Sequence, residues 1–511
     1  MAFRPSHWVA RRTVSSALLA AMVLAPSLAW SSAEEEHASS AATVIDGEAN
    51  EVGAEGAEDS PEPYRSSPAL VPGEQDSSNR TGEEDPTERS LTLEEVLSLA
   101  QALLVQGQLD DAEKIYRSLL QSSANESIRI EAAFQIGQIL VYRGRYREAA
   151  LYFIDILNHK PDLPRVRLEL ARAYFLDKNY PDATFQFELV KGGNLPPEVI
   201  VNVDTFLDSI RRQKNWSLDF SMNPAVDSNI SQTSGDKEEC VDIWGMLLCR
   251  PLDKKTSGIG LNVDANLDYF KRFSQDWGLR ASAGINALEY SGSDFDDYSL
   301  YAALGPRYLW TNGEASLQPT FRKRWYAKKQ YREEYGLRVD GRQVLGRFIL
   351  DSTASYTANN YDNTYLHNIL NGYAWRGRLQ PRYILNDRTF VQIGLDFLHE
   401  KTNETAYSND NWTYSLGAYR ILPYGFSLFL QGSLTESKYK APQWYVTKDN
   451  RIDEAVRRDK TWGLTVMLSS NRFEKYNLTP IVRYSYTKRN SNIWSREYER
   501  NRLDLLMNLR I

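Results

Sequence analysis

The sequence predicts two folded parts: an N-terminal helical solenoid and, after it, an antiparallel transmembrane β-barrel of about fourteen strands. Three observations support this prediction: a secretory signal at the start, a helical repeat between residues 91 and 214, and alternating strands from Trp216 to Ile511. Successive side chains of a strand face opposite sides, so alternation of apolar and polar residues gives each strand one apolar and one polar face. A closed barrel with lipid outside and water inside requires this pattern.

Composition fits an exported membrane protein rather than a nucleic-acid binder. The 511 residues carry a formal net charge of −7, with 42% hydrophobic and 12% aromatic residues. Beyond the N-terminus no apolar run reaches the roughly 18–20 residues that a membrane-spanning helix needs. A barrel escapes that criterion because only alternate residues of its strands need be apolar.

The first segment, residues 1–29, reads as a cleaved signal peptide. It has three arginines, an apolar stretch from Val14 to Leu28, and small residues that place cleavage after Ala29 or after Ala33. Residues 30–90 follow as a predicted disordered acidic tether. Glu34–Ser90 holds sixteen acidic residues against three arginines, a net charge of −13, and cannot bury enough apolar surface to order itself. Its alternative use is to attract basic cargo or chaperones.

Residues 91–214 show the tetratricopeptide pattern of three repeats and a capping helix. Equivalent alanines recur at spacings of 37 and 34 residues, small residues let paired helices approach, and a proline ends the middle repeat. The predicted packing residues are Ala112, Gly137, Ala149, Phe153, Pro161 and Ala183. Such a stack presents a concave surface that binds peptide segments or partner proteins, although it could also serve as a spacer or as a plug for the barrel.

Residues 215–511 form the predicted barrel, and Gly258–Phe270 is its clearest strand. Connections alternate between short turns and longer loops, and the longest loops are Asp227–Ser257 and Lys438–Val456. Outer-membrane barrels keep short turns in the periplasm and long loops outside. An even number of strands therefore returns both ends of the barrel, and with them the helical repeats, to the periplasm.

Counting by twos places a set of arginines on the polar, lumen-facing side of the middle strands. They are Arg280, Arg307, Arg338, Arg342, Arg376, Arg378 and Arg382. Two interpretations remain open: a network of paired charges that braces a water-filled interior, or a basic track for an acidic passenger. Cys240 and Cys249 share the first long loop, and we expect them to form a disulfide in an exported protein.

The sequence offers little for catalysis, and we expect no enzyme activity, cofactor or metal site. Of five histidines, only His399 lies near a barrel rim beside acidic residues, where outer-membrane hydrolases place a catalytic histidine. Counting by twos nevertheless puts His399 on the lipid-facing side with Leu395 and Phe397. Phosphate-binding loops and metal-ligand spacings do not stand out.

The whole layout resembles the surface lipoprotein assembly modulator family, which combines a periplasmic tetratricopeptide domain with a C-terminal barrel of about fourteen strands. The start of the barrel carries the resemblance in Phe220–Ile230, where Asp227, Ser228 and Asn229 are similar to the turn after the family's first strand. The helix that begins at Pro196-Pro197 and ends at Ser209–Arg212 is similar to the family's link between its domains. The resemblance covers Leu91 to Ile511.

The resemblance implies a translocon of the Gram-negative outer membrane that delivers specific lipoproteins or related secreted proteins to the cell surface. Expected partners are that cargo, periplasmic chaperones, the barrel-assembly machinery and outer-membrane lipids. A folded 100-residue domain has a radius of gyration of ~13 Å, too large for a barrel of this size. Cargo would therefore pass unfolded, or along an opened seam between the first and last strands. Rival interpretations are an exopolysaccharide export porin with periplasmic repeats and a passive porin.

Overall fold

The structure is a computed structural model that describes residues 92–213, 215–235, 238–243, 246–251, 255–471 and 478–510. The predicted signal peptide (1–29) and acidic tether (30–90) lie outside the described residues. The chain divides into two compact units: the helices up to Gly144 belong to one, and everything from Arg145 onward belongs to the other. None of the described helices is long and apolar enough to span a membrane.

The described part of the first unit contains three helices: α3 (Leu93–Val105), α4 (Leu109–Ser122) and α5 (Glu126–Tyr142). Thr92 begins α3 with a capping box, because its side chain accepts from the Glu95 backbone while the Glu95 carboxylate accepts from the Thr92 backbone. Ala112 of α4 and Gly137 of α5 are buried, as the repeat pattern predicts, and such small residues allow paired helices to approach closely.

Four helices open the second unit: α6 (Tyr146–His159), α7 (Pro164–Leu176), α8 (Tyr180–Val190) and α9 (Pro197–Gln213). Ala149, Phe153 and Ala183 are each at most 1% exposed. Pro161 follows the end of α6, and its carbonyl accepts a hydrogen bond of 2.8 Å from Arg167 Nη2. The tetratricopeptide packing residues of this unit therefore lie in its helical core.

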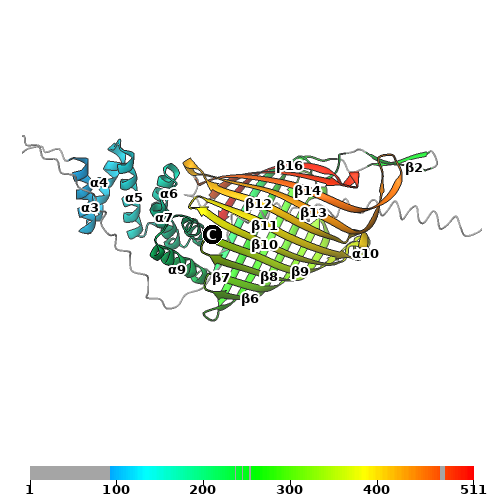
Figure 1. Cartoon of the computed structure of the whole chain (residues 1–511), viewed down its shortest axis with the longest axis horizontal. Coiled ribbons are helices and arrows are strands. Elements are labelled where there is room, and N and C mark those ends of the chain that lie inside the picture. The colour runs from blue at the N-terminus through cyan, green and yellow to red at the C-terminus, as the bar shows by residue number, and fades with distance from the viewer. Residues whose placement is uncertain are drawn as a thin grey trace, which may run out of the picture. The chain divides into compact units, whose positions relative to one another are not determined.

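The rest of the second unit is a closed antiparallel barrel of fourteen strands, as predicted, in which each strand pairs with its neighbour in sequence and β1 closes on β16 (Figure 1). Its strands are β1 (Trp216–Asp227), β4 (Gly258–Arg272), β5 (Trp277–Tyr290), β6 (Asp297–Trp310), β7 (Gly313–Tyr326), β8 (Lys329–Leu345), β9 (Phe348–Tyr361), β10 (Gly372–Asn386), β11 (Thr389–Thr402), β12 (Asn409–Ile421), β13 (Phe426–Val446), β14 (Ile452–Ser470), β15 (Leu478–Ser491) and β16 (Tyr498–Arg510).

Several of the described connections between barrel strands hold short elements of their own. The separate hairpin β2 (Glu238–Ile243) and β3 (Met246–Pro251) follows β1, and a short helix α10 (Thr364–Leu370) joins β9 to β10. The segment 438–456, predicted as a long loop, is mostly strand: β13 and β14 stay paired as far as Val446 and Ile452. A register shift between Lys438 and Pro442 absorbs the proline, which cannot donate to the ladder.

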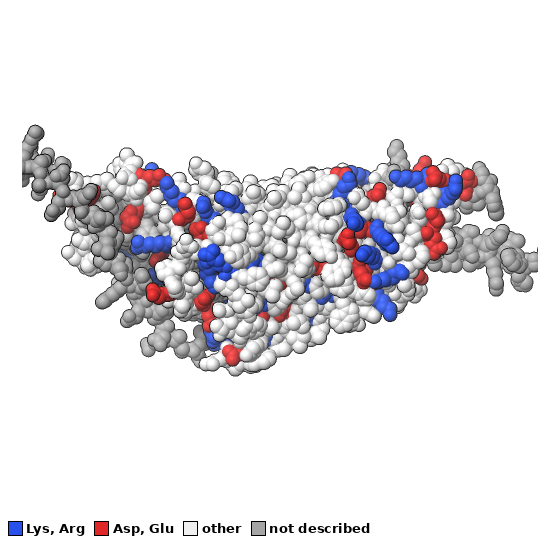
Figure 2. All heavy atoms as spheres, viewed as in Figure 1, with Lys and Arg blue, Asp and Glu red and all other residues white. Residues whose placement is uncertain are grey.

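Alternation along the strands divides the barrel wall into two faces. The outward face is apolar and exposed, as at Leu267, Ile285, Leu304, Leu416 and Leu464. On the face that Figure 2 shows, the middle of the barrel is mostly uncharged, and charged side chains gather toward the loops and toward the helices. The inward face is polar and crowded, and it holds the candidate site.

Candidate functional site

Arginine–carboxylate pairs fill much of the lumen. On β5, the side chain of Arg280 is buried, and its Nε donates to Asp268 Oδ1 of β4 at 2.9 Å. Neighbouring strands bring such groups together because inward-facing residues lie directly opposite or diagonal to one another across a ladder.

All seven arginines of the predicted basic track face the lumen, and each has a carboxylate within ion-pair distance. Arg307 pairs with Glu314, Arg338 with Asp340 at 2.8 Å, Arg342 with Glu188 at 2.6 Å, Arg376 and Arg378 with Asp396 at 3.2 and 2.8 Å, and Arg382 with Glu188 at 3.8 Å. Arg382 also lies over the ring of Phe390 at 4.9 Å. Acidic neighbours thus neutralise most of the positive charge of the track locally, although Glu188 and Asp396 are each shared by two arginines.

Further lumenal pairs escaped the sequence interpretation, although counting by twos on the later strands would have found them. Asp504 of β16 is fully buried and accepts from Arg483 at 3.0 Å and from Arg502 at 2.9 Å. Arg457 and Asp459 of β14 form another buried pair, with Nη2 and Oδ2 2.5 Å apart. A charge buried in this way is tolerated only when a partner neutralises it.

The part of the lumen near α10 adds tyrosines to the arginines. Arg324, which pairs with Asp297, lies 5.2 Å from the ring of Tyr331, and Arg332 lies 5.6 Å from the ring of Tyr361. Leu370 of α10 joins the same buried cluster as these tyrosines. The loop between β9 and β10 therefore packs against lumen-facing side chains and narrows this end.

The end of helix α8 packs inside the opposite mouth of the barrel, where β1 begins. Leu189, only 1% exposed, belongs to a hydrophobic cluster that otherwise consists of inward-facing barrel residues. That cluster includes Ile349 of β9, Phe390 of β11, Phe429 of β13 and Met467 of β14, so it forms an apolar ring inside the mouth. The end of α8 inserts into this ring.

Polar contacts hold the helices in that position. Glu188, the neighbour of Leu189, accepts from Arg342 Nη2, and Arg347 Nη2 donates to the carbonyl of Gly193 at 3.1 Å. The ion pair between Arg167 of α7 and Asp387 spans 3.8 Å. Gly192 allows close approach, because a Cβ there would meet the carbonyl oxygen of Asn386 at 2.6 Å. Helices of the repeat and turns of the barrel thus form one packed junction.

The seam between β1 and β16 differs from the other ladders. Seven described pairs are in register across it, and the ladder is interrupted between Met222 and Ala225, where Pro224 has no N–H to donate. Prolines interrupt the β6–β7 and β10–β11 ladders too, but those retain eleven and twelve pairs. Among the strand pairs that the structure describes in the barrel, the seam is the shortest.

The family-like residues at the start of the barrel fasten one end of this seam. Asp227 accepts two hydrogen bonds from Arg500, of 2.9 and 2.5 Å. Ser228 exchanges two backbone-directed hydrogen bonds with Asn501, of 2.9 and 2.8 Å, and Asn229 Nδ2 donates to the Glu499 carbonyl at 3.0 Å. We call Asp227, Ser228 and Asn229 the seam clasp. They join β1 to β16 at the end of the barrel opposite the mouth that α8 enters.

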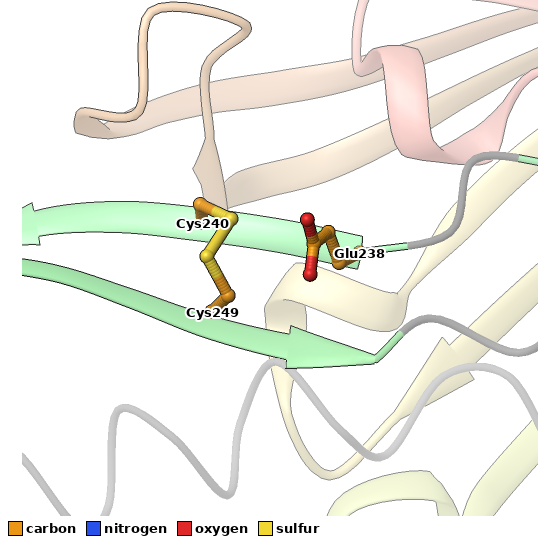
Figure 3. A group of neighbouring side chains, drawn as sticks. All are labelled: Glu238, Cys240 and Cys249. Atoms are coloured by element: carbon orange, nitrogen blue, oxygen red, sulfur yellow. A yellow bond between two sulfur atoms is a disulfide. The ribbon is translucent and has the colours of Figure 1, made fainter.

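Cys240 and Cys249 face each other across the β2–β3 hairpin and form a disulfide (Figure 3). Glu238 lies on the same strand as Cys240, and its carboxylate comes within 4.8 Å of both sulfurs. Because both sulfurs belong to the disulfide, neither is a thiolate, so this grouping is not a metal centre.

His399 faces outward on β11, where its Nδ1 lies 2.6 Å from Asp410 Oδ1, and Lys440 contacts the other oxygen of that carboxylate. The side chain belongs to the same outward row as the exposed Leu395.

These features define an outer-membrane β-barrel with a helical repeat domain on its periplasmic side. The family model "Surface lipoprotein assembly modifier" matches residues 216–508, and the chain belongs to that family. A tetratricopeptide repeat model matches residues 134–189. The protein resides in the outer membrane of a Gram-negative bacterium, with its tetratricopeptide domain in the periplasm.

Three curated relatives resemble the chain over most of its length. The surface lipoprotein assembly modifier of Pasteurella multocida is 24% identical over 71% of this chain and 73% of its own. Surface lipoprotein assembly modifier 1 of Neisseria meningitidis is 23% identical over 70% of this chain and 71% of its own. The hemophilin secretion modulator of Acinetobacter baumannii is 22% identical over 72% of this chain and 77% of its own.

Proposed function

We propose that this protein delivers specific lipoproteins, or related secreted proteins, from the periplasm to the cell surface. The tetratricopeptide domain recruits the cargo, and the cargo then passes through the barrel or along its wall. Family membership supports the cargo class, since the relatives are named for surface lipoprotein assembly and for hemophilin secretion. Periplasmic chaperones and the barrel-assembly machinery complete the partners, and the protein acts without catalysis.

The observation that carries the proposal is the junction between α8 and the mouth of the barrel. Leu189 and Glu188 engage barrel residues directly, so the last repeat is built into the entrance. A segment bound by the repeats would be released next to β1, which follows α9 after Lys214 and Asn215. A passive porin has no need of such an entrance.

The proposed route is the β1–β16 seam rather than the centre of the lumen. Ion pairs and the apolar ring occupy the lumen, and clearing them would leave several buried charges unpaired, at a cost of about 3–5 kcal/mol for each broken pair. Parting the seam removes seven register pairs and the seam clasp. Lipid could then accept the acyl chains of a lipoprotein during transfer.

A cysteine pair across the seam tests this route. Val226 and Leu503 are direct register partners and both face outward. We expect V226C/L503C to abolish surface display of the cargo under oxidising conditions and to recover it on reduction. The matched control, L267C/A283C, joins β4 to β5 at register partners and should leave display unchanged. Normal display by the oxidised seam variant would refute the seam route while leaving the lumenal route open.

The function itself is tested by deletion of the gene followed by proteomics of the surface of intact cells. Loss of particular surface lipoproteins, restored by the intact gene, is the expected result. Unchanged surface protein together with lost capsular or exopolysaccharide would instead favour the polysaccharide exporter. Unchanged surface composition with reduced uptake of small solutes would favour the passive porin.

A further inference from the structure

Strands β11, β13, β14 and β15 share a change in character along their outward rows, whereas the row of β12 between them ends in Asp410. On β13 the outward residues run from the exposed Leu430, through the half-buried Glu436, to the exposed Lys438 and Lys440. On β14 the corresponding row runs from Leu464 and Trp462 to Lys460 and Arg458. Each row is therefore apolar in its middle and cationic toward the end that carries the loops.

Register brings these cations together into one surface, which we call the outer cationic face. Its members are Lys401, Lys438, Lys440, Arg458, Lys460 and Lys488. Lys438 lies opposite Arg458 across β13–β14, with Asp410 opposite Lys438 on the other side.

Part of this face is neutralised locally and part is not. Asp410 pairs with Lys440, and Glu436 pairs with Lys460 at 3.0 Å. Among the described residues, no carboxylate lies within ion-pair distance of Lys438, Arg458 or Lys488, which are all exposed. Carboxylates still lie on the neighbouring strands, with Asp410 opposite Lys438 and Glu499 opposite Lys488. The three cations that form no close ion pair therefore point outward from the barrel wall.

The depth of the face in the membrane follows from the tryptophans beside it. Trp375, Trp412 and Trp462 face outward and are 54%, 44% and 51% exposed. Tryptophan is enriched where hydrocarbon meets the headgroups of a membrane. Lys460 stands two residues beyond Trp462 on the same strand, about 7 Å further out at the rise of a strand. The outer cationic face thus lies at the level of the headgroups of the outer leaflet.

The opposite side of the barrel lacks this surplus. The charged residues that face outward near the outer ends of β5, β7 and β8 are Glu289, Lys323 and Glu333, and the exposed Lys329 begins β8, so positive and negative charges are equal in number there. Lys323 and Glu333 form an ion pair of 2.8 Å with each other. The contrast between the two sides argues for a ligand on one side, because a general need for solubility would distribute charge around the rim.

We propose that the outer cationic face binds the phosphate groups of lipopolysaccharide in the outer leaflet. Phosphate accepts hydrogen bonds from Arg and Lys. The apolar parts of the same outward rows would contact the acyl chains of the lipopolysaccharide. Binding on one side would fix the rotation of the barrel relative to the glycolipid and leave the β1–β5 side to other lipids. This inference goes beyond the proposed function, because it depends on the orientation in the membrane and on no property of the cargo.

Binding of purified lipid A to the full-length protein in detergent tests the proposal, measured by native mass spectrometry. The test variant is K438Q/R458Q, which removes two facing cations. Each cation near an anionic surface contributes about fivefold, so we expect bisphosphorylated lipid A to bind about 25-fold more weakly. The control variant, K271Q/R420Q, removes the same charge from exposed outward positions at the periplasmic end and should bind as the parent does.

A second lipid identifies the group that is recognised. Lipid A stripped of both phosphates should bind the parent protein as weakly as bisphosphorylated lipid A binds K438Q/R458Q. Heat-dependent mobility on gels reports whether each variant is folded. Unweakened binding by folded K438Q/R458Q, equal weakening by the control, or tight binding of the dephosphorylated lipid would each overturn the proposal.

Discussion

At the scale of single residues, the molecule is governed by charges that are buried and paired. Asp504 is the clearest case, since it is fully buried and accepts from two arginines on two strands. Its partners Arg483 and Arg502 are themselves at most 7% exposed. The carboxylate is what makes two neighbouring buried guanidinium groups tolerable.

Replacement of Asp504 by asparagine should therefore destabilise the barrel strongly. Breaking a buried pair by removing one partner costs about 3–5 kcal/mol, because the remaining charge is buried without compensation. The loss of stability is measured as a shift in the midpoint of urea unfolding, with heat-dependent gel mobility as the readout of the folded fraction. The exposed Asp453 at the outer end of β14 provides the control, and D453N should leave that midpoint within error of the parent.

A second prediction at this scale concerns acid and the first helical unit. Burial alone would raise the pKa of Glu113, but its hydrogen bonds and ion pairs with Arg117 and Arg143 outweigh burial and lower the pKa below its ordinary value of 4.5. A lowered pKa in the folded state contributes stability above the unfolded value, and that stability is lost as pH falls through the folded pKa.

We expect the first unit to lose stability below about pH 4.5 and E113Q to lose part of that pH dependence. A fluorescent label placed within residues 92–144 of the full chain reports the unfolding of the first unit as pH falls, and circular dichroism of the same sample reports the loss of helix in the whole chain. An E113Q variant with the parental pH profile would contradict the assignment to Glu113.

At the scale of elements, the junction of α8 with the barrel mouth is the most informative contact. Sequence reasoning foresaw a plug as one possible use of the repeats, but the contact depends on residues without a recognisable motif. Glu188 and Leu189 look like ordinary helix residues, and only the folded barrel brings Arg342 and the apolar ring to them.

Two adjacent glycines permit a test of that junction. A Cβ at Gly192 would meet backbone atoms of Asn386 at 2.6 Å, whereas a Cβ at Gly193 would meet nothing nearer than the Val190 carbonyl at 3.3 Å. We expect G192A to displace the end of α8 and the residues that follow it from the mouth of the barrel. The ion conductance of the barrel in planar bilayers should then rise. G193A is the matched control, and equal conductance of both variants would argue against a sealing junction.

The strands show how far sequence patterns reach. Alternation predicted fourteen strands and their two faces, even for β7, where Arg322, Lys323 and Arg324 interrupt the apolar row. In the structure Lys323 faces outward and pairs with Glu333 across β8, while Arg324 faces inward and pairs with Asp297 of β6. Partners on neighbouring strands decide such cases, and they depend on register, which the pattern of a single strand does not contain.

At the scale of the whole molecule, the division at Gly144 separates three helices from the remainder. The predicted solenoid is continuous in sequence, so this division was not foreseeable from the repeat spacing. The seam clasp was foreseen only as a resemblance. Its partners Arg500 and Asn501 lie 273 residues away, and no local pattern connects them.

Removal of residues 92–144 should accordingly leave the barrel able to fold and insert, since helices α6 to α9 and all strands lie in the other unit. Heating should shift the gel mobility of the shortened chain as it shifts that of the parent. Surface display of cargo should fall at least several-fold if those helices recruit it. Failure of the shortened chain to insert would show that the first unit is needed for assembly rather than for recruitment.

The distance in sequence across the seam also has a consequence for biogenesis. Ser228 and Asn501 bond to each other although nearly the whole barrel lies between them in the chain. The ladder that closes the cylinder can form only after the final strand has been delivered, so β1 waits with an open edge while twelve other strands are laid down. A chain interrupted late in synthesis retains two unpaired edges, and we expect periplasmic proteases to remove it.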